Sequence, residues 1–238
     1  WPRIYGVDFT GGVEKDLWMN LSGRSHCESC GHDLSLWDVF PVIGLLTSRL
    51  KCRYCGAKVP VVYPIIETAM AVFGFTIWMV FGYTAETPLI LTFAVFAMII
   101  SWVDIDTLWV PDCLSFPFMA IGLSLSVFCP DPEKRILGAI FGGLAIWACM
   151  YVVSKRYDKD LMSTGDVVLF AGCMAWIGIE NIASFMLISG LSGGIIALIL
   201  SVLNKKWGIE GESVFPFGPG IMAGGLICIL FYKYISLI

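Results

Sequence analysis

The sequence predicts an all-α polytopic membrane protein with one small polar region near its start. Of the 238 residues, 58% are hydrophobic and only 14% are charged, whereas a soluble domain is about 45–50% apolar and about 25% charged. The apolar stretches are continuous and do not alternate with polar residues, which favours membrane-spanning helices over β-barrel strands. The net charge is −4 and no basic stripe is present, so nucleic acid is not an expected partner.

Seven apolar stretches are candidates for membrane spans. A helix needs about 20 apolar residues to cross a bilayer, and fewer where it ends in a cavity lined by protein. The predicted spans cover residues 59–81, 88–103, 114–128, 136–154, 167–179, 182–203 and 219–238. We therefore divide the chain into a polar domain, residues 1–58, and a transmembrane domain, residues 59–238.

Lysine and arginine give the predicted orientation, because short cytoplasmic loops carry an excess of both. Segment 1–58 carries seven of these residues, loop 155–166 carries three and loop 204–218 carries two. With segment 1–58 in the cytoplasm, that side carries 12 and the opposite side carries three. Loop 104–113 has no lysine or arginine but falls on the cytoplasmic side. Both acidic motifs described below are therefore predicted at the cytoplasmic face.

Four cysteines in the polar domain have the spacing of a zinc site. They form two Cys-x-x-Cys knuckles, Cys27 with Cys30 and Cys52 with Cys55, separated by 21 residues. Two such knuckles can place four thiolates tetrahedrally around zinc. His26 and His32 flank the first knuckle, but four thiolates already complete the shell, so a structural zinc is expected. The alternative is two disulfides, which a reducing cytoplasm disfavours.

Two acidic motifs stand at the ends of predicted spans. The first is Asp104-Ile-Asp106-Thr-Leu-Trp-Val-Pro111-Asp112, and the second is Ser163-Thr-Gly165-Asp166. A carboxylate within the bilayer costs roughly 3 kcal/mol, so acids at such positions indicate function.

Other hydrolytic chemistries lack the residues that they need. The two histidines both lie beside the knuckles, so no span holds a His-Glu-x-x-His metal motif or a histidine that could activate a serine or cysteine. The stretch Gly190-Leu-Ser192-Gly193 is rich in small residues, which are typical of close helix packing.

A pair of carboxylates remains as the candidate catalytic machinery. Two acids held close together share a proton, so one can take a proton from water while the other protonates the scissile carbonyl. We expect Asp104 and Asp166 to form this pair, with Gly165 allowing close approach of backbone to Asp166. Three further acids are expected to support the site: Asp106, Asp112 and Glu67. Asp112 follows Pro111 and is placed to cap the next helix. Spacing alone leaves solvated loop acids as an alternative for Asp104, Asp106 and Asp112, and a buried acid bonded to a neighbouring helix as an alternative for Glu67.

Taken together, these motifs resemble the type IV prepilin peptidases, bifunctional leader peptidases and N-methyltransferases of the Gly-x-Gly-Asp class of aspartic proteases. The resemblance runs from about Asn20 to the end of the chain. Its motifs are Cys27-x-x-Cys30-Gly-His, Leu50-Lys-Cys52-Arg-Tyr-Cys55, Tyr63-Pro64-Ile-Ile-Glu67, the acidic run Asp104 to Asp112, Gly165-Asp166-Val-Val-Leu169 and Phe215-Pro-Phe-Gly218-Pro219.

The resemblance implies residues, substrates and cofactors. It selects Asp104 as the first catalytic acid, because the family's first acid stands eight residues before the acid that follows proline, here Asp112. Asp106 is the second choice for that role. The resemblance selects Asp166 as the second catalytic acid. It implies cleavage of a basic leader from prepilins or pseudopilins, after a glycine, at the cytoplasmic face of the bacterial inner membrane. Methylation of the new N-terminus with S-adenosylmethionine is implied as well, and the cysteine segment is similar to the family's zinc-binding loop. The implied partners are the prepilin N-terminus and the lipid bilayer.

The chain departs from the family pattern in three respects. The family has eight spans, and the first is not among the seven predicted here. Ser163 stands where the first glycine of Gly-x-Gly-Asp is common, and Val168 stands where lysine is common. Two functions from other classes stay open: a transporter or proton relay, which would need more ionisable groups deep in the spans, and a scaffold that recruits assembly factors through the zinc loop. The oligomeric state is open too.

Overall fold

The computed structural model describes residues 26–27, 29–35, 38, 50–59, 62–157, 164–203 and 216–237. Within these ranges the regular elements are helices, and two isolated bridges are the only β pairing. The predicted all-α class is therefore confirmed. The chain forms two compact units, Trp1–Gly82 and Tyr83–Ile238. The predicted division into domains at residue 58 stays a prediction.

The first unit contains the cysteine segment and α4 (Val62–Phe81). Two threonines of α4, Thr68 and Thr76, donate their hydroxyls to the carbonyls of Pro64 and Val72 at 2.7 and 2.8 Å. A hydroxyl bonded back to its own helix in this way needs no water, which suits a helix that lies in lipid.

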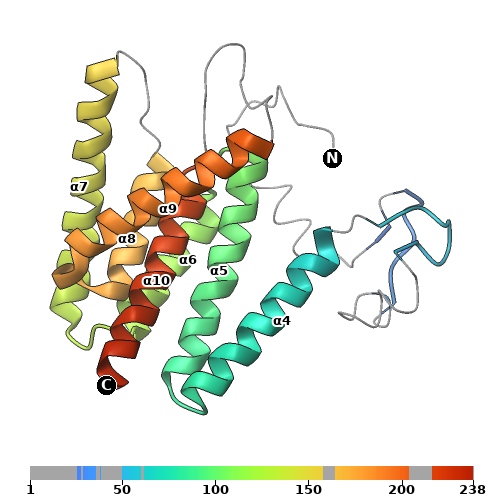
Figure 1. Cartoon of the computed structure of the whole chain (residues 1–238), viewed down its shortest axis with the longest axis horizontal. Coiled ribbons are helices and arrows are strands. Elements are labelled where there is room, and N and C mark those ends of the chain that lie inside the picture. Colours follow the sequence, from blue (N-terminus) through green and yellow to red (C-terminus); the bar gives the residue numbers. More distant parts are fainter. Residues whose placement is uncertain are drawn as a thin grey trace. The chain divides into compact units, whose positions relative to one another are not determined.

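The second unit is an up-and-down helical assembly, drawn from green to red in Figure 1. Its elements are α5 (Glu86–Thr107), α6 (Asp112–Leu125), α7 (Pro132–Tyr157), α8 (Thr164–Ile177), the 3-10 turn η1 (Ile179–Asn181), α9 (Ile182–Leu203) and α10 (Gly218–Leu237). Each helix coincides with a predicted span to within a few residues. Four of the described helices are long and apolar enough to cross a bilayer. The apolar stretches of α6, of α8 and of α10 (Gly218–Phe231) are shorter. The exact number of spans stays a prediction.

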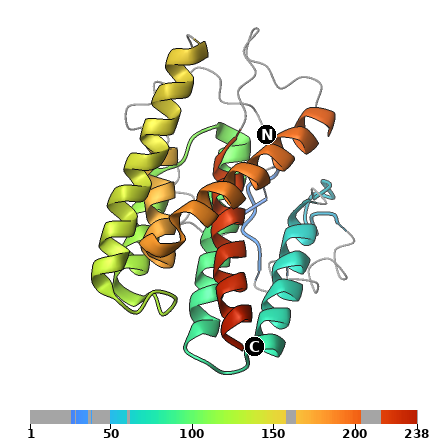
Figure 2. The same ribbon diagram turned by 60° about the vertical axis from the view of Figure 1, so that its left-hand side comes forward.

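Helix α8 lies at the centre of this unit, in contact with α6, α7 and α10, as Figures 1 and 2 both show. Its Trp176 is fully buried and forms an aromatic cluster with Phe93 of α5 and Phe118 of α6, with ring centroids 5.0–5.6 Å apart. The indole Nε1 of Trp176 donates to the carbonyl of Phe118 at 3.0 Å. This cluster joins three helices and satisfies the one polar atom of the indole ring.

Small residues bring the helices together. A Cβ at Gly138 of α7 would lie 2.9 Å from the carbonyl oxygen of Met174 in α8. On the other side of the unit, Gly220 of α10 lies so close to Gly193 of α9 that a Cβ would overlap its backbone. Ser192 donates its hydroxyl to the carbonyl of Gly220 at 2.8 Å. The helix-packing interpretation of Ser192 and Gly193 is therefore confirmed.

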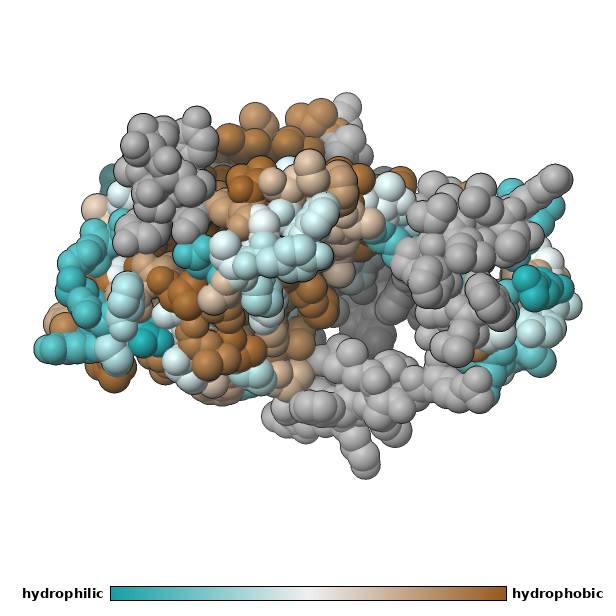
Figure 3. All heavy atoms as spheres, turned by 90° about the horizontal axis from the view of Figure 1, so that it is seen from below, coloured by the Kyte–Doolittle hydropathy of each residue, from teal (hydrophilic) through white to brown (hydrophobic). Residues whose placement is uncertain are grey.

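Large apolar side chains remain exposed on the outer helices. On α7 they include Ile136, Ile140, Phe141 and Leu144, each about half exposed. Figure 3 shows hydrophobic residues, in brown, over much of the coloured helical surface in view. A surface of this kind is stable in lipid and would be a liability in water.

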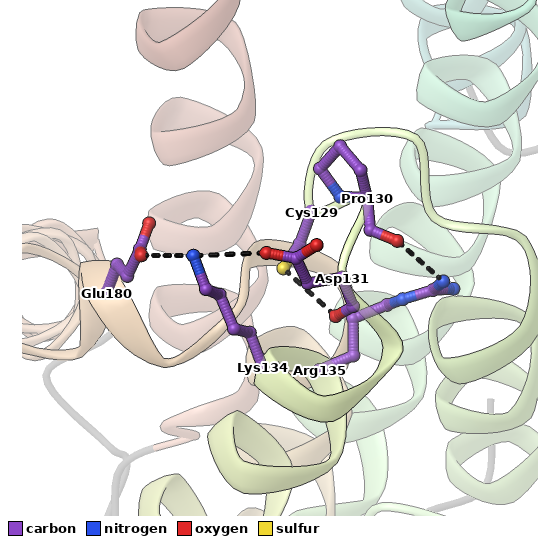
Figure 4. Close-up of polar contacts among 6 residues, drawn as sticks. All are labelled: Cys129, Pro130, Asp131, Lys134, Arg135 and Glu180. Atoms are coloured by element: carbon purple, nitrogen blue, oxygen red, sulfur yellow. Dashed lines mark hydrogen bonds and ion pairs between the residues drawn. The ribbon is translucent and has the colours of Figure 1, made fainter.

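Figure 4 shows polar groups that join the turn between α6 and α7 to the first turns of α7 and to η1. Lys134 lies between Asp131 and Glu180, with its Nζ 3.1 and 2.6 Å from their carboxylates. The neighbouring Arg135 is buried and donates to the carbonyls of Leu123 and Pro130 at 2.7 and 3.3 Å. Arg135 thereby satisfies the Leu123 carbonyl in the last turn of α6, which has no partner within that helix, and also a carbonyl of the loop that follows.

Candidate active site and candidate metal centre

The two cysteine knuckles have the same local backbone. In the first, Gly31 N–H donates to the carbonyl of Cys27 at 2.7 Å, and in the second, Gly56 N–H donates to that of Cys52 at 2.8 Å. Both glycines have a positive φ, 68° and 73°, a conformation that costs other residues energy. The glycine after each Cys-x-x-Cys pair therefore allows the chain to turn back so that both cysteines point the same way.

The four predicted ligands lie together. The sulfur atoms of Cys27, Cys30, Cys52 and Cys55 all lie within 4.8 Å of one another. The cysteines are free thiols, and the sulfurs of Cys27 and Cys55 are 3.8 Å apart, far beyond the ~2.05 Å of a disulfide bond. A regular tetrahedron of sulfurs about 2.3 Å from zinc has edges of about 3.8 Å. The Cys27–Cys55 separation is therefore that of two zinc ligands, and the other sulfur pairs lie within 4.8 Å. The four sulfurs therefore fit a tetrahedral metal ion.

The ionisation of the thiols is also consistent with a metal. N–H groups of Cys30 and Ser29 lower the pKa of the Cys27 thiol to about 6, so this sulfur is a thiolate at neutral pH. The Ala57 N–H favours the Cys55 thiolate, but desolvation and the neighbouring thiols outweigh it and raise the pKa of Cys55 to about 12. A cation among the sulfurs would favour the thiolate form of Cys55 and so lower its pKa.

Neither flanking histidine belongs to the sulfur cluster within the described residues. The ring of His32 lies against that of Tyr54 in the second knuckle, with ring centroids 3.6 Å apart and the ring planes tilted by 35°. Arg53 of the same knuckle approaches the Asp38 carboxylate at 3.5 Å, and the Ser35 hydroxyl donates to that carboxylate at 2.6 Å. These contacts tie the two knuckles together around the sulfurs.

Asp104 lies in the last turn of α5, and not in the loop after it as the predicted span 88–103 implied. Helix α5 continues to Thr107, and Leu108 is its C-cap. Leu108 has a left-handed φ of 55°, and its N–H donates to the Asp104 carbonyl at 2.8 Å. The Asp104 side chain is only 4% exposed, and its Oδ2 accepts a hydrogen bond from Gly218 N–H at 2.8 Å. Because a buried partner satisfies the carboxylate, the helix can continue through this acid.

Asp166 lies in the first turn of α8, which begins at Thr164, two residues before the acid. It is 9% exposed, so both candidate acids are buried in terminal turns of helices. The solvated-loop alternative is therefore wrong for Asp104. Acids in the first turn of a helix are favoured by the helix dipole, which accounts for the early start of α8.

The segments that carry the two acids are in contact. A Cβ at Gly165 would lie 3.1 Å from the Cβ and 3.2 Å from the carbonyl oxygen of Val110, in the loop that follows Asp104. Helix α10 packs against both α5 and α8. The end of α5, the start of α8 and the start of α10 lie at the same end of the unit (Figures 1 and 2). The expectation that Gly165 allows close backbone approach agrees with this contact.

The remaining predicted residues have different positions. Asp112 is exposed and is the first residue of α6, whose N-cap is Pro111, so the expected capping role of Asp112 is wrong. Asp106 lies in the last turn of α5, and its side chain is outside the described residues. Glu67 is half-buried on α4 of the other unit. Its supporting role and that of Asp106 stay predictions, and Ser163 lies outside the described residues.

Sequence reasoning missed one residue at the site, Gly218. The motif Phe215-Pro-Phe-Gly218-Pro219 was noted only as part of a resemblance. A glycine followed by proline at the start of an apolar span is typical of a helix N-terminus, and helix N-termini bind carboxylates. That signal could have indicated an acid opposite Gly218, although not which one.

Comparison with known proteins identifies the family. Residues 14–81 match the model of the bacterial peptidase A24 N-terminal domain, and residues 91–198 match that of the type IV leader peptidase family. The chain is 32% identical over 218 residues to a prepilin leader peptidase/N-methyltransferase of Pseudomonas aeruginosa, across 90% of this chain and 73% of that relative. The chain belongs to the type IV leader peptidase family.

Further relatives agree with this assignment. A prepilin leader peptidase/N-methyltransferase of Stutzerimonas stutzeri is 30% identical over 217 residues, across 90% of this chain and 73% of that relative. A type 4 prepilin-like proteins leader peptide-processing enzyme of Escherichia coli is 27% identical over 212 residues, across 87% and 75% respectively. No solved structure matches the chain. The predicted family, the assignment as a prepilin peptidase and the inner-membrane location are therefore confirmed, whereas the aspartic mechanism and the side of the membrane stay predictions.

Proposed function

We propose that this leader peptidase is an aspartic endopeptidase that uses Asp104 and Asp166 to remove the leader of type IV prepilins or pseudopilins after a glycine. The observation that carries the proposal is the burial of both acids in terminal turns at one end of one helical unit. The contact between Gly165 and Val110 supports it, because it joins the two acid-bearing segments. The names of the relatives supply the substrate class.

The proposed chemistry needs only the two carboxyl groups and one water. The ionised acid takes a proton from water, the water oxygen adds to the carbonyl carbon, and the protonated acid gives its proton to the carbonyl oxygen. Collapse of the tetrahedral intermediate breaks the C–N bond. The acid that took the proton from water gives it to the leaving amine, and one hydroxyl of the intermediate returns its proton to the other acid as the new carboxyl group forms. The pair then returns to a state with one shared proton.

The position of Asp166 relative to α7 supports a site below the membrane surface. Gly143 of α7 faces Val167, next to Asp166, and α7 continues for 14 more residues to Tyr157, roughly 20 Å at 1.5 Å per residue. Along this extension Trp147 stacks on Tyr151, and the Nζ of Lys155 lies 5.9 Å from the Tyr151 ring. Aromatic and basic residues of this kind are typical of the membrane interface. We place that interface, on the cytoplasmic side, along this part of α7.

The proposal includes a structural zinc and a second activity. Cys27, Cys30, Cys52 and Cys55 would hold zinc with no open position, so the metal would stabilise the segment and take no part in hydrolysis. The relatives' names include N-methyltransferase. We extend to this chain the methylation of the amine that leader cleavage releases, with S-adenosylmethionine as methyl donor.

Replacing each acid by its amide tests the catalytic pair. Asp104→Asn and Asp166→Asn keep the size of the side chain and remove its ability to accept and donate the catalytic proton. We expect each to reduce leader cleavage of a prepilin-like peptide in detergent by about a thousandfold or more, as for other paired catalytic groups. The matched control is Glu133→Gln, because Glu133 is an exposed acid at the start of α7. Full cleavage by either folded Asp→Asn variant would exclude the pair.

A further inference from the structure

The start of α10 has an unusual arrangement of backbone donors. Phe217 is the residue before the helix, and its carbonyl accepts from the N–H groups of Gly220 and Ile221 at 3.0 and 3.1 Å. Pro219 has no N–H group. The N–H of Gly218 is thus the first-turn donor that points away from the helix, and it donates to Asp104 Oδ2 at 2.8 Å. An acid of α5 takes the place of the side-chain cap that α10 does not supply itself.

The contact leaves no space for a side chain at residue 218. A Cβ there would lie 2.7 Å from Asp104 Oδ2, 3.1 Å from its Cγ and 3.2 Å from its Cβ. Glycine is therefore the residue that lets the α10 backbone approach the carboxylate from the side. Further along, Gly225 is placed between α5 and α8, since its Cβ would lie 2.7 Å from the Phe93 ring and 3.2 Å from the Cys173 sulfur.

We propose that Gly218 is a positioning residue for leader cleavage: its N–H fixes the Asp104 carboxylate against α10 so that this acid meets Asp166 in a defined orientation. The inference rests on the proposed function of the two acids. A carboxyl group rotates about its Cβ–Cγ bond, and a hydrogen bond to Oδ2 stops that rotation. The second oxygen, Oδ1, then has a fixed direction and is the one available to take the proton from water. Preorganisation of this kind acts on the chemical step, because displacement of a catalytic group by about 1 Å can reduce the rate a hundredfold.

The test compares three glycine-to-alanine substitutions in the full-length protein. Gly218→Ala displaces the carboxylate, and we expect kcat for leader cleavage to fall about 10- to 100-fold while KM changes little. Gly194→Ala is the matched control, because nothing lies within 4 Å of a Cβ at that position in α9. Gly224→Ala would push α10 away from Ser189, 2.8 Å from the new Cβ, and so tests packing of α10 without touching Asp104.

A second readout separates positioning from general damage. Methyl transfer to an already cleaved pilin peptide needs no aspartate chemistry, so Gly218→Ala should retain this activity at the level of Gly194→Ala. The inference is overturned if Gly218→Ala cleaves as fast as Gly194→Ala, or if Gly224→Ala reduces kcat as much as Gly218→Ala. The proposed function fails separately, through full cleavage by Asp104→Asn or Asp166→Asn.

The contact can be tested without activity should Gly218→Ala not fold. Hydrogen exchange at the Gly218 amide should be slow in the native protein and in Asp104→Asn, whose side-chain carbonyl still accepts the bond. It should be faster in Asp104→Ala, which has no acceptor. Equal protection of this amide in Asp104→Ala and the native protein would contradict the assigned contact and the inference with it.

Discussion

The cysteine cluster gives the sharpest quantitative prediction, because four thiolates bind zinc at a known distance of about 2.3 Å. The sulfurs of Cys27 and Cys55 are 3.8 Å apart, which is the separation of two ligands at that distance in a regular tetrahedron, and all four sulfurs lie within 4.8 Å of one another. X-ray absorption at the zinc edge of the purified protein should therefore show four sulfur neighbours at about 2.3 Å and no nitrogen. Metal analysis should give one zinc per chain.

The perturbation is the loss of one thiolate. Cys52→Ser removes a buried ligand, and Cys27→Ser removes one from the other knuckle. Zinc binding is worth about 10–16 kcal/mol in small zinc domains, so losing one of four ligands should reduce occupancy after dialysis against a chelator to a small fraction of that in the native protein. His32→Gln is the matched control, since His32 packs against the Tyr54 ring and lies outside the sulfur cluster. It should keep full occupancy.

Two results would refute this reasoning. Unchanged zinc content in both Cys27→Ser and Cys52→Ser would reject the four-thiolate site. A nitrogen neighbour that disappears in His32→Gln would mean that the histidine replaces a thiolate, and the geometric argument from the sulfur distance would then be wrong.

Two further predictions concern stability, measured as thermal midpoints in one detergent. Trp176→Phe should destabilise the protein by about 1–3 kcal/mol, because the buried Phe118 carbonyl loses the indole donor at 3.0 Å; an unchanged midpoint would contradict the role of this bond. Arg135→Met should cost more than Lys134→Met, although Lys134 makes the shorter contact. Arg135 is buried against two carbonyls, whereas the side chains of Lys134 and Glu180 are 41% and 68% exposed and their pair is worth under ~1 kcal/mol. The reverse order of midpoints would be inconsistent with burial as the deciding factor.

The features that sequence predicted best are those that depend on neighbours along the chain. The positions of all seven described helices follow from continuous apolar stretches, and the sulfur cluster follows from two Cys-x-x-Cys pairs with a glycine after each. Helix ends were less accurate at the acids. The spans were predicted to end before Asp104 and to begin after Asp166, because a charge in lipid is costly. The structure places both acids inside helices.

What sequence could not supply is the partner of a buried charge. Gly218 and Asp104 are separated by 114 residues, and no periodicity along either helix encodes a contact between the end of one and the start of another. The same holds for Val110 and Gly165. Such contacts arise from the arrangement of α5, α8 and α10, and that arrangement depends on packing of small residues in the whole unit.

The short helices α6 and α8 suit the proposed site, which needs water at two buried acids. Each has 14 residues, about 21 Å of helix, against a hydrocarbon core of about 30 Å. Their far ends are joined by the Ser126 hydroxyl, which donates to the Trp176 carbonyl at 2.6 Å, while α7 continues well beyond α8 at the end that carries Asp166. The missing length therefore falls mainly on the side of the two acids. Backbone at this depth is tolerated without helix only beside protein or water. The ends of α6 and α8 on the side of Asp104 and Asp166 therefore suit the proposed hydrolytic site better than the longer helices do.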